Sequence, residues 1–346
     1  MFVSLVKKNK FIILFLSLFF SCLSTISLKA NPTFVDGTVV DDQGGDANTA
    51  EERFTTGLSF NNNGTKMFIT GTENASANEF TLSTAFDIST RSFEDAFDIS
   101  DAGGPNEDLA PTSAKFNDDG TKMFTAGFKQ FIKEFSLSTA FDVSTSTFVQ
   151  IKDLSTELTL NDPKDIEFNS DGTKMFIFEN SNINIYTLST GFDISTASYD
   201  DTVSVSDFED EATGFAFSDD GTVMFTLGRK DKAVNEFYLS TGFDLTTASH
   251  VSSFSIKGTD VHPKGIGFNN DGSKMFFLGN ENDSVYEYTL VSNYNLKLPT
   301  LSSSSPADNA TGVSVDANIV LTFSEKVNVD SGNITIHKTS DDSTVA

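Results

Sequence analysis

The stretch FNDDGTKMFT, residues 116–125, occurs five times in this chain with small variations. The five copies begin at Phe60, Phe116, Phe168, Phe217 and Phe268, and their glycines lie 56, 52, 49 and 51 residues apart. Self-similarity at a period of about fifty residues is typical of repeat architectures, in which each repeat is one supersecondary unit. These repeats therefore govern the fold of most of the chain.

Each repeat predicts four β-strands. The first ends at the shared phenylalanine, and an Asp-Gly or Asn-Gly turn follows, which favours a hairpin. The second strand begins at Lys-Met-Phe and has apolar side chains on both faces, so both faces need cover. The third strand precedes a second shared block, LSTAFDIST at residues 82–90, and the fourth follows it. Four strands covered on both faces by neighbouring repeats predict an all-β, five-bladed β-propeller.

The two ends of the array predict how the ring closes. The fifth repeat has strands one to three but no fourth, while Thr33-Phe34-Val35 precedes the first repeat. That tripeptide matches residues 147–149, part of a predicted fourth strand, residue for residue. We therefore predict that the N-terminus supplies the outer strand of the last blade, which would remove an exposed sheet edge.

The repeated hairpin carries a family resemblance. The segment Phe-Asn-x-Asp-Gly-Thr-Lys-Met-Phe resembles the Ser-Pro-Asp-Gly hairpin of TolB-type and YVTN-type propeller repeats, over residues 33–296. The chain departs from that pattern because it lacks the proline, and it contains no tryptophan. The resemblance implies blade architecture and says little about function.

The first thirty residues predict export. Lys7, Lys8 and Lys10 precede an apolar run at residues 11–20, and a polar stretch ends at Ala30, as in a secretory signal peptide. Two alternatives stay open: an uncleaved anchor, and a lipoprotein attached through Cys22, although the residues before Cys22 form a poor lipobox. The expected domains are a signal peptide at 1–30, the propeller at 31–296 and a further segment at 297–346.

Composition and charge limit the classes of function that the chain can have. Removal of residues 1–30 takes away four lysines and no acidic residue, which leaves 19 basic against 49 acidic residues, a net charge of −30. Such a chain repels phosphate backbones, which excludes nucleic-acid binding. Cys22 is the only cysteine, so the mature chain has no disulfide. We expect a secreted or cell-surface protein of a bacterial envelope, with no transmembrane segment after cleavage.

Residues 297–346 differ from the repeats. They contain SPADNATGV at 305–313, LTFSE at 321–325 and GNITI at 332–336, in an order that resembles the start of an SbsA-type bacterial Ig-like domain. An Ig-like sandwich needs about 100 residues, so the resemblance implies a truncated domain in a fragment of a longer surface protein. The alternative is a short tail that pairs onto the propeller.

One set of acidic residues suggests a metal site. The positions eight residues before the shared phenylalanines are occupied by Glu52, Asp108, Leu160, Glu209 and Asp260. Connections between blades crowd around one mouth of a propeller channel, so these residues would form a ring, with Asp162 and Glu211 beside them. The ring has three interpretations: a Ca²⁺ site, a glycosidase pair of carboxylates, or a solvated acidic rim.

The three histidines, His250, His262 and His337, lie in different regions, which gives little support to a zinc site or a Ser-His-Asp triad. We therefore expect no established cofactor apart from Ca²⁺ at the acidic ring. His250 stands where other repeats have an aromatic residue, so its predicted role is structural.

The sequence favours a surface binding or adhesion module. Similar blades would present repeated equivalent surfaces and gain avidity, as in a lectin, for a carbohydrate or another surface protein. The alternatives are a propeller glycosidase that uses carboxylates at the channel mouth, and a ligand-free structural spacer. An enzyme needs non-equivalent residues at one place, and the similarity of the blades argues against one.

Overall fold

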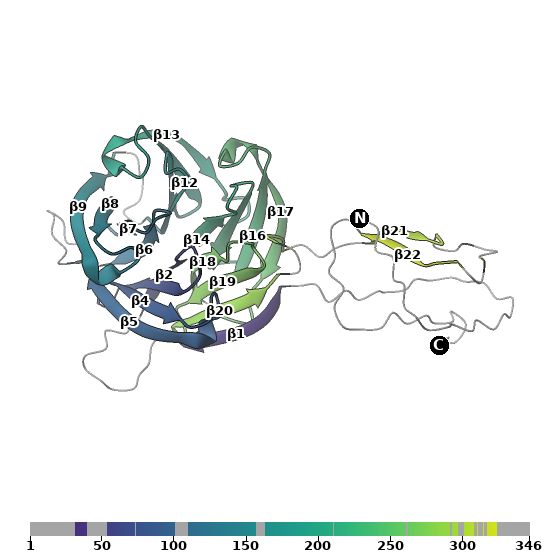
Figure 1. Ribbon diagram of the computed structural model, residues 1–346. Coiled ribbons are helices and arrows are strands. Elements are labelled where there is room, and N and C mark those ends of the chain that lie inside the picture. The colour runs from purple at the N-terminus through teal and green to yellow at the C-terminus, as the bar shows by residue number, and fades with distance from the viewer. Residues whose placement is uncertain are drawn as a thin grey trace. The chain divides into compact units, whose positions relative to one another are not determined.

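The structure is a computed structural model that describes residues 32–39, 54–72, 74–100, 110–156, 163–209, 211–260, 262–290, 293–296, 301–307, 310, 314 and 317–323. Residues Pro32–Leu296 form one compact unit. Five four-stranded antiparallel sheets in this unit surround a central axis (Figure 1), which confirms the five-bladed propeller. The predicted signal peptide lies outside the described residues.

The blades follow one another along the chain. The first holds β2 (Thr55–Phe60), β3 (Lys66–Gly71), β4 (Ser76–Leu82) and β5 (Arg91–Asp98). The second holds β6 (Pro111–Phe116), β7 (Lys122–Gly127), β8 (Phe131–Leu137) and β9 (Ser146–Asp153). The third holds β10 (Asp165–Phe168), β11 (Lys174–Glu179), β12 (Asn182–Leu188) and β13 (Ala197–Ser204).

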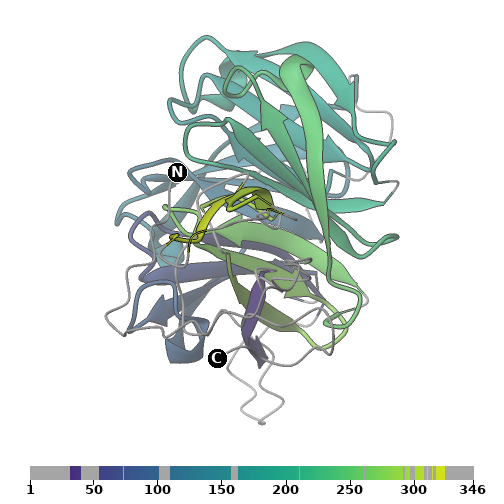
Figure 2. The ribbon, with the colours of Figure 1, turned by 90° about the vertical axis from the view of Figure 1, so that its right-hand side faces the viewer.

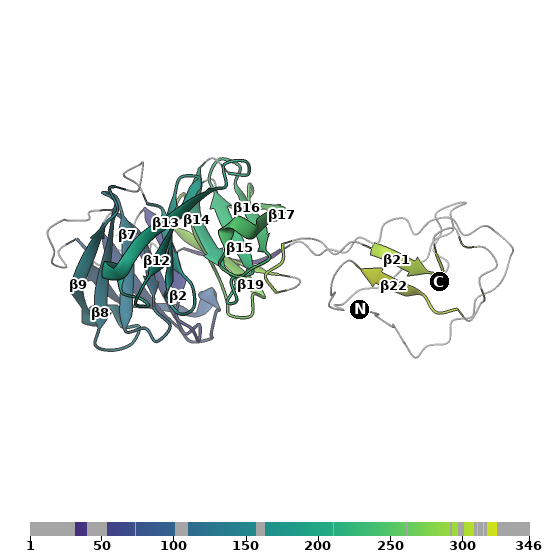
Figure 3. The same ribbon diagram turned by 90° about the horizontal axis from the view of Figure 1, so that it is seen from above.

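The fourth blade holds β14 (Ala212–Phe217), β15 (Val223–Gly228), β16 (Ala233–Leu239) and β17 (Ala248–Ser255). The fifth holds β18 (Pro263–Phe268), β19 (Lys274–Gly279) and β20 (Ser284–Thr289). Inner strands end at the shared phenylalanines, as predicted. Views turned by 90° (Figures 2 and 3) show hairpin-linked strands side by side, and the described residues contain no α-helix.

Strand β1 (Thr33–Val39) completes the fifth blade, where it pairs antiparallel with β20 (Figure 1). Phe34 lies opposite Tyr288, just as Phe148 lies opposite Phe135 in the second blade. Each pairing has a β-bulge directly beside this aromatic pair. The predicted closure by the N-terminal strand is therefore confirmed.

The core lies between blades. Met123 of the second blade packs with Phe68 of the first, and Met67 of the first packs with Phe276 of the fifth. All four side chains are buried. Each buried side chain of this size contributes about 1.5–3 kcal/mol. Strand two is therefore apolar on both faces because each face meets a different neighbouring blade.

The Asp-Gly turns differ in detail from short hairpins. In the second blade the loop between β6 and β7 contains five residues, 117–121, and Gly120 has φ of +69°. Its amide donates to the carbonyl of Asn117 at 3.0 Å, and Asp119 Oδ1 accepts a hydrogen bond from the Thr121 amide at 3.0 Å. The Asp and the Gly are turn residues, as predicted, and the five-residue loop fits the predicted end of strand one and start of strand two.

The second shared block packs an aromatic ring onto this turn. Asp142 caps the 3₁₀ helix η2 (Val143–Thr145), and Phe141 just before it lies over Gly120. A Cβ on Gly120 would meet the Phe141 ring at 2.2 Å. Equivalent 3₁₀ helices are η1 (Ile88–Thr90), η3 (Ile194–Thr196) and η4 (Leu245–Thr247). In the fifth blade Tyr294 lies over Gly272 in the same way.

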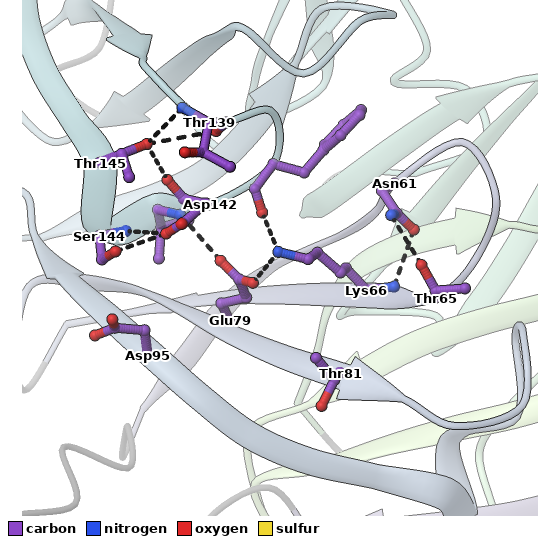
Figure 4. Close-up of polar contacts among 12 residues, drawn as sticks. Asn61, Thr65, Lys66, Glu79, Thr81, Asp95, Thr139, Asp142, Ser144 and Thr145 are labelled. Carbon is purple, nitrogen blue, oxygen red and sulfur yellow. Dashed lines mark hydrogen bonds and ion pairs between the residues drawn. The ribbon is translucent and has the colours of Figure 1, made fainter.

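A polar clamp joins the first two blades (Figure 4). Lys66 forms an ion pair with Glu79 in its own blade and donates to the carbonyl of Phe141 in the next blade at 2.8 Å. Glu79 Oε2 accepts a hydrogen bond from the Val143 amide at 2.9 Å. The clamp therefore fixes the second shared block of one blade to strands two and three of the blade before it.

Two later blades keep half of this clamp. Lys174 of the third blade donates to the carbonyl of Phe243 at 3.1 Å, but Ile185 stands at the glutamate position. In the fourth blade Glu236 Oε2 accepts a hydrogen bond from the Leu296 amide at 2.8 Å, but Val223 replaces the lysine. Either half alone thus still bridges to the following blade.

The C-terminal segment is a separate unit. Strand β21 (Leu301–Ser305) pairs antiparallel with β22 (Val320–Phe323), and Leu321 is buried while Ile319 is exposed. Within the part of the chain that is described, no helix is both long and apolar enough to cross a membrane.

Candidate functional site

The structure describes two of the four residues predicted to form the acidic ring. Glu209 is buried, and its Oε1 accepts a hydrogen bond from the Glu211 amide at 2.8 Å. Its carboxylate lies against Gly228 at the end of β15, where a Cβ would meet Oε2 at 1.4 Å. Burial raises the pKa of Glu209. The carboxylate therefore packs within its own blade.

Asp260 repeats this arrangement in the fifth blade. Its Oδ1 accepts a hydrogen bond from the His262 amide at 2.6 Å, and Tyr286 donates to its Oδ2 at 3.3 Å. A Cβ on Gly279 would meet Oδ2 at 2.3 Å. Glu52, Asp108, Leu160 and Asp162 lie outside the described residues. The acidic ring therefore stays a prediction.

The described acidic residues and His250 show no arrangement typical of a metal site. Among the described residues no three His, Cys, Asp or Glu side chains gather as metal ligands would. His250 stacks on Phe208 with 4.3 Å between ring centroids, and its Nε2 lies 3.0 Å from Ser253 Oγ. These contacts support its structural role. His337 lies outside the described residues.

The channel mouth where the inner strands begin holds a cavity of about 250 Å³. Its described lining includes Thr56, Thr112 and Thr213 together with Lys164 and Lys264. Neither Glu209 nor Asp260 is among these lining residues. The Lys164 ammonium lies 5.7 Å from the centroid of the Phe128 ring.

A larger cavity, of about 470 Å³, lies where the inner strands end, and we call it the axial cavity. All five blades contribute aromatic walls: Phe60, Phe86, Phe116, Phe141, Phe168, Phe192, Phe217, Phe243, Phe268 and Tyr294. Each of these rings is only partly buried. The rings belong to the two shared blocks, so the repeat itself builds the walls. A concave cavity that combines apolar walls with polar groups is a common form of ligand site.

The polar floor of the axial cavity is not symmetric. Lys115 at the end of β6 and Glu167 at the end of β10 line the cavity and form an ion pair of 2.7 Å. Asp165 lies deeper, 3.8 Å from the Lys115 ammonium. Its Oδ1 accepts a hydrogen bond from Ser113 Oγ at 2.5 Å, and its Oδ2 accepts one from the Phe215 amide at 3.1 Å. Three blades therefore hold this cluster rigidly.

Burial and mutual charge shift the pKa values of the floor residues Lys115 and Glu167. Burial raises the pKa of Glu167 to about 7, although the Lys115 ammonium opposes this shift. Burial would lower the pKa of Lys115, but the carboxylates of Asp165 and Glu167 outweigh it and raise that pKa. Lys115 thus remains charged, while Glu167 exchanges its proton near neutral pH.

The rim of the axial cavity consists of the residues two positions after the shared phenylalanines: Asn62, Asp118, Ser170, Asp219 and Asn270. Asn62 Nδ2 donates to the carbonyl of Asp118 at 2.5 Å, and Tyr294 donates to Asp219 Oδ1 at 3.2 Å. Burial raises the pKa of Asp118, and the charges of Asp119 and Asp219 add to this rise. Two carboxylates thus stand at one opening.

Sequence reasoning missed this floor. The residue before each shared phenylalanine is Ser59, Lys115, Glu167, Ala216 or Gly267, so this position differs in every blade. The repeat pattern is defined by the shared residues and does not include this position. A comparison of the repeats for positions that vary, rather than for positions that agree, would have identified Lys115 and Glu167 as candidates.

Comparison with solved structures returns proteins of low similarity. One is a candidate 6-phosphogluconolactonase of Bacteroides uniformis, with TM-score 0.43 and 15% identity over 67% of this chain and 65% of that one. Another, from Bacteroides fragilis and of the same description, has TM-score 0.41 and 13% identity over 78% and 68%. A functionally unknown protein of Desulfotomaculum acetoxidans has TM-score 0.42 and 11% identity over 71% and 73%. The specific TolB-type or YVTN-type resemblance is not confirmed.

Sequence comparison concerns the C-terminal segment. No curated protein matches the chain. Residues 297–346 match the family model of the bacterial Ig-like domain. The chain thus consists of a five-bladed β-propeller followed by a segment of bacterial Ig-like type, as the sequence predicted.

Proposed function

We propose that the propeller is a ligand-binding module of an exported or surface-exposed bacterial protein, and that its ligand binds in the axial cavity. The observation that carries this proposal is the ring of ten partly exposed aromatic side chains around the Lys115–Glu167 pair. Aromatic walls supply apolar contact, and the floor supplies one donor and one acceptor. The match to a bacterial Ig-like domain supports a surface location.

The shape of the axial cavity changes the number of ligands expected to bind per chain. The five aromatic sites are equivalent by sequence, but their side chains line one shared cavity. A small ligand on the axis would therefore bind once per chain rather than five times. Lectin-like recognition of a carbohydrate, or adhesion to another surface protein, would then depend on a single group inserted into the axial cavity.

The test is a glycan-binding screen on the purified chain, with and without Ca²⁺, followed by calorimetric titration of each ligand found. We expect a stoichiometry near one. The variant Ser170→Trp would fill the rim and abolish binding, since Ser170 is exposed and lines the cavity. Ser198→Trp, on the exposed outer strand of the same blade, is the matched control and should bind normally. Binding that survives Ser170→Trp would place the ligand elsewhere.

A glycosidase is the second candidate, and Glu167 favours it. A carboxyl group with a pKa of about 7 is suited to proton transfer at neutral pH. Asp165 is buried below the floor, so a second carboxylate would come from the rim, from Asp118 or Asp219. Turnover of a glycan that disappears in Glu167→Gln while binding persists would establish catalysis, and binding without turnover would leave the module as a receptor.

A further inference from the structure

The axial cavity carries an excess of negative charge. Its charged lining residues are three carboxylates, Asp118, Glu167 and Asp219, and one ammonium, Lys115. Asp165 adds a fourth carboxylate below the floor, 3.8 Å from Lys115. Because Lys115 is shared between Asp165 and Glu167, its charge is already balanced. The cavity is therefore poorly suited to an anionic ligand.

The two rim carboxylates lack a cation. Asp219 accepts a hydrogen bond from Tyr294. Among the described residues, neither Asp118 nor Asp219 has an ion-pair partner. Both residues are exposed at the rim, and partial desolvation raises the pKa of each carboxyl group; the charge of Asp219 adds to the rise at Asp118. An incoming positive charge would relieve this repulsion. The lining carboxylates come from three blades: Asp118 from the second, Glu167 from the third and Asp219 from the fourth.

The walls favour the same kind of ligand. A cation within about 6 Å of an aromatic face is attracted by the negative face of the ring. Phe192, Phe243 and Tyr294 line the same cavity as the rim carboxylates and are partly exposed, and Tyr294 contacts Asp219. The strongly acidic chain also raises the local concentration of cations around it. The negative faces of the aromatic walls, the rim carboxylates and the negative charge of the whole chain therefore all favour a cationic ligand.

The floor adds a requirement for hydroxyl groups. The Lys115 ammonium donates and the Glu167 carboxylate accepts, 2.7 Å apart, and a sugar hydroxyl can do both at once. A simple alkylammonium would satisfy the rim and the walls but make no hydrogen bond with this ion pair. A sugar that carries an ammonium group satisfies all three.

We propose that the axial cavity recognises an amino sugar, with its ammonium group between the aromatic walls and the Asp118 and Asp219 carboxylates and its hydroxyls on the Lys115–Glu167 pair. This inference rests on the proposed function of the cavity as the binding site. It adds the charge of the ligand, which a lectin-like role alone does not specify.

The experiment compares glucosamine with N-acetylglucosamine, which has the same ring without the charge, by calorimetric titration of the full chain at pH 7. One favourable charge contact predicts affinity for glucosamine that is about tenfold higher. The double variant Asp118→Asn/Asp219→Asn should remove that difference. The control Asp200→Asn/Asp207→Asn changes the net charge equally at exposed positions away from the cavity, and should preserve it.

The outcomes separate this inference from the proposed function. Equal affinity for the two sugars, abolished by Ser170→Trp, would overturn the charge preference and leave the cavity as the site. Nα-acetyl-lysine amide that binds as tightly as glucosamine would overturn the assignment to a sugar. If neither sugar binds, the inference is overturned. If binding is unaffected by Ser170→Trp, both the inference and the proposal that the cavity is the binding site are overturned.

Discussion

The ring of Phe34, in the first described strand, packs edge-to-face on the ring of Tyr288, in the last strand of the propeller, with 5.6 Å between centroids. Phe254 of the fourth blade contacts the same tyrosine at 5.5 Å. Tyr288 therefore joins the N-terminal strand to the fourth and fifth blades. Without β1, the backbone edge of β20 would be open to pairing with another chain.

Deletion of residues 31–41 should therefore open the ring. We expect a lower melting temperature and self-association, measured by circular dichroism and light scattering. Phe34→Ala removes only the ring contact, and should cost about 1 kcal/mol without association. A deletion variant that stays monomeric with an unchanged melting temperature would contradict the role of β1.

The clamp between the first two blades should contribute to stability. Glu79→Ala leaves the Val143 amide and the Lys66 ammonium without their carboxylate, and loss of a buried ionic partner costs about 3 kcal/mol. Glu94→Ala, at an exposed position on β5, is the control and should change stability by less than about 0.5 kcal/mol. Thermal melting measures both.

Replacement of Glu79 by isoleucine separates the contribution of packing from that of the hydrogen bonds. Ile185 occupies the glutamate position in the third blade and is buried there. Glu79→Ile should therefore cost less than Glu79→Ala, because its side chain fills the space that alanine leaves empty. Equal losses would indicate that the hydrogen bonds, rather than packing, dominate the clamp.

The glycine of each turn should resist substitution. Gly120→Ala would place a Cβ 2.2 Å from the Phe141 ring at φ of +69°, so backbone strain and ring displacement together should cost at least about 2 kcal/mol. Gly258→Ala, where no atom lies within 4 Å of the added Cβ, should be nearly neutral. A loss at Gly120 no larger than that at Gly258 would contradict both the backbone strain and the ring contact.

Glu167 should make stability depend on pH between about 4.5 and 7. Its pKa in the folded protein, about 7, is above the ordinary value of 4.5, so the folded state binds the proton more tightly. Stability from this group is complete below pH 4.5 and is lost as pH rises through 7, by about 3 kcal/mol. Melting temperatures of wild type and Glu167→Gln across this range measure the loss.

The difference between the two proteins isolates Glu167. Burial lowers the pKa of His250, which makes stability rise with pH up to about 6.5, and both proteins share this opposing effect. Glu167→Gln should therefore lose less stability than wild type from pH 5 to pH 8. Parallel profiles would show that Glu167 ionises without cost in the folded protein.

Local sequence determined the architecture of the propeller. Strand ends at the shared phenylalanines, glycine turns and the match of Phe34 with Phe148 depend on residues adjacent in the chain, and these were predicted correctly. The Asp-Gly pair alone did not reveal that Phe141 covers the glycine from 21 residues away.

Tertiary structure decided the chemistry of the axis. Lys115 and Glu167 are 52 residues apart, at one repeat position of adjacent blades, and the closed ring brings them to 2.7 Å. Glu209 and Asp260 share a repeat position, but each turns into its own blade against a glycine. The sequence determined the blades, because hairpins are local. Which side chains meet on the axis depends on how five blades pack around it, and no single repeat contains that information.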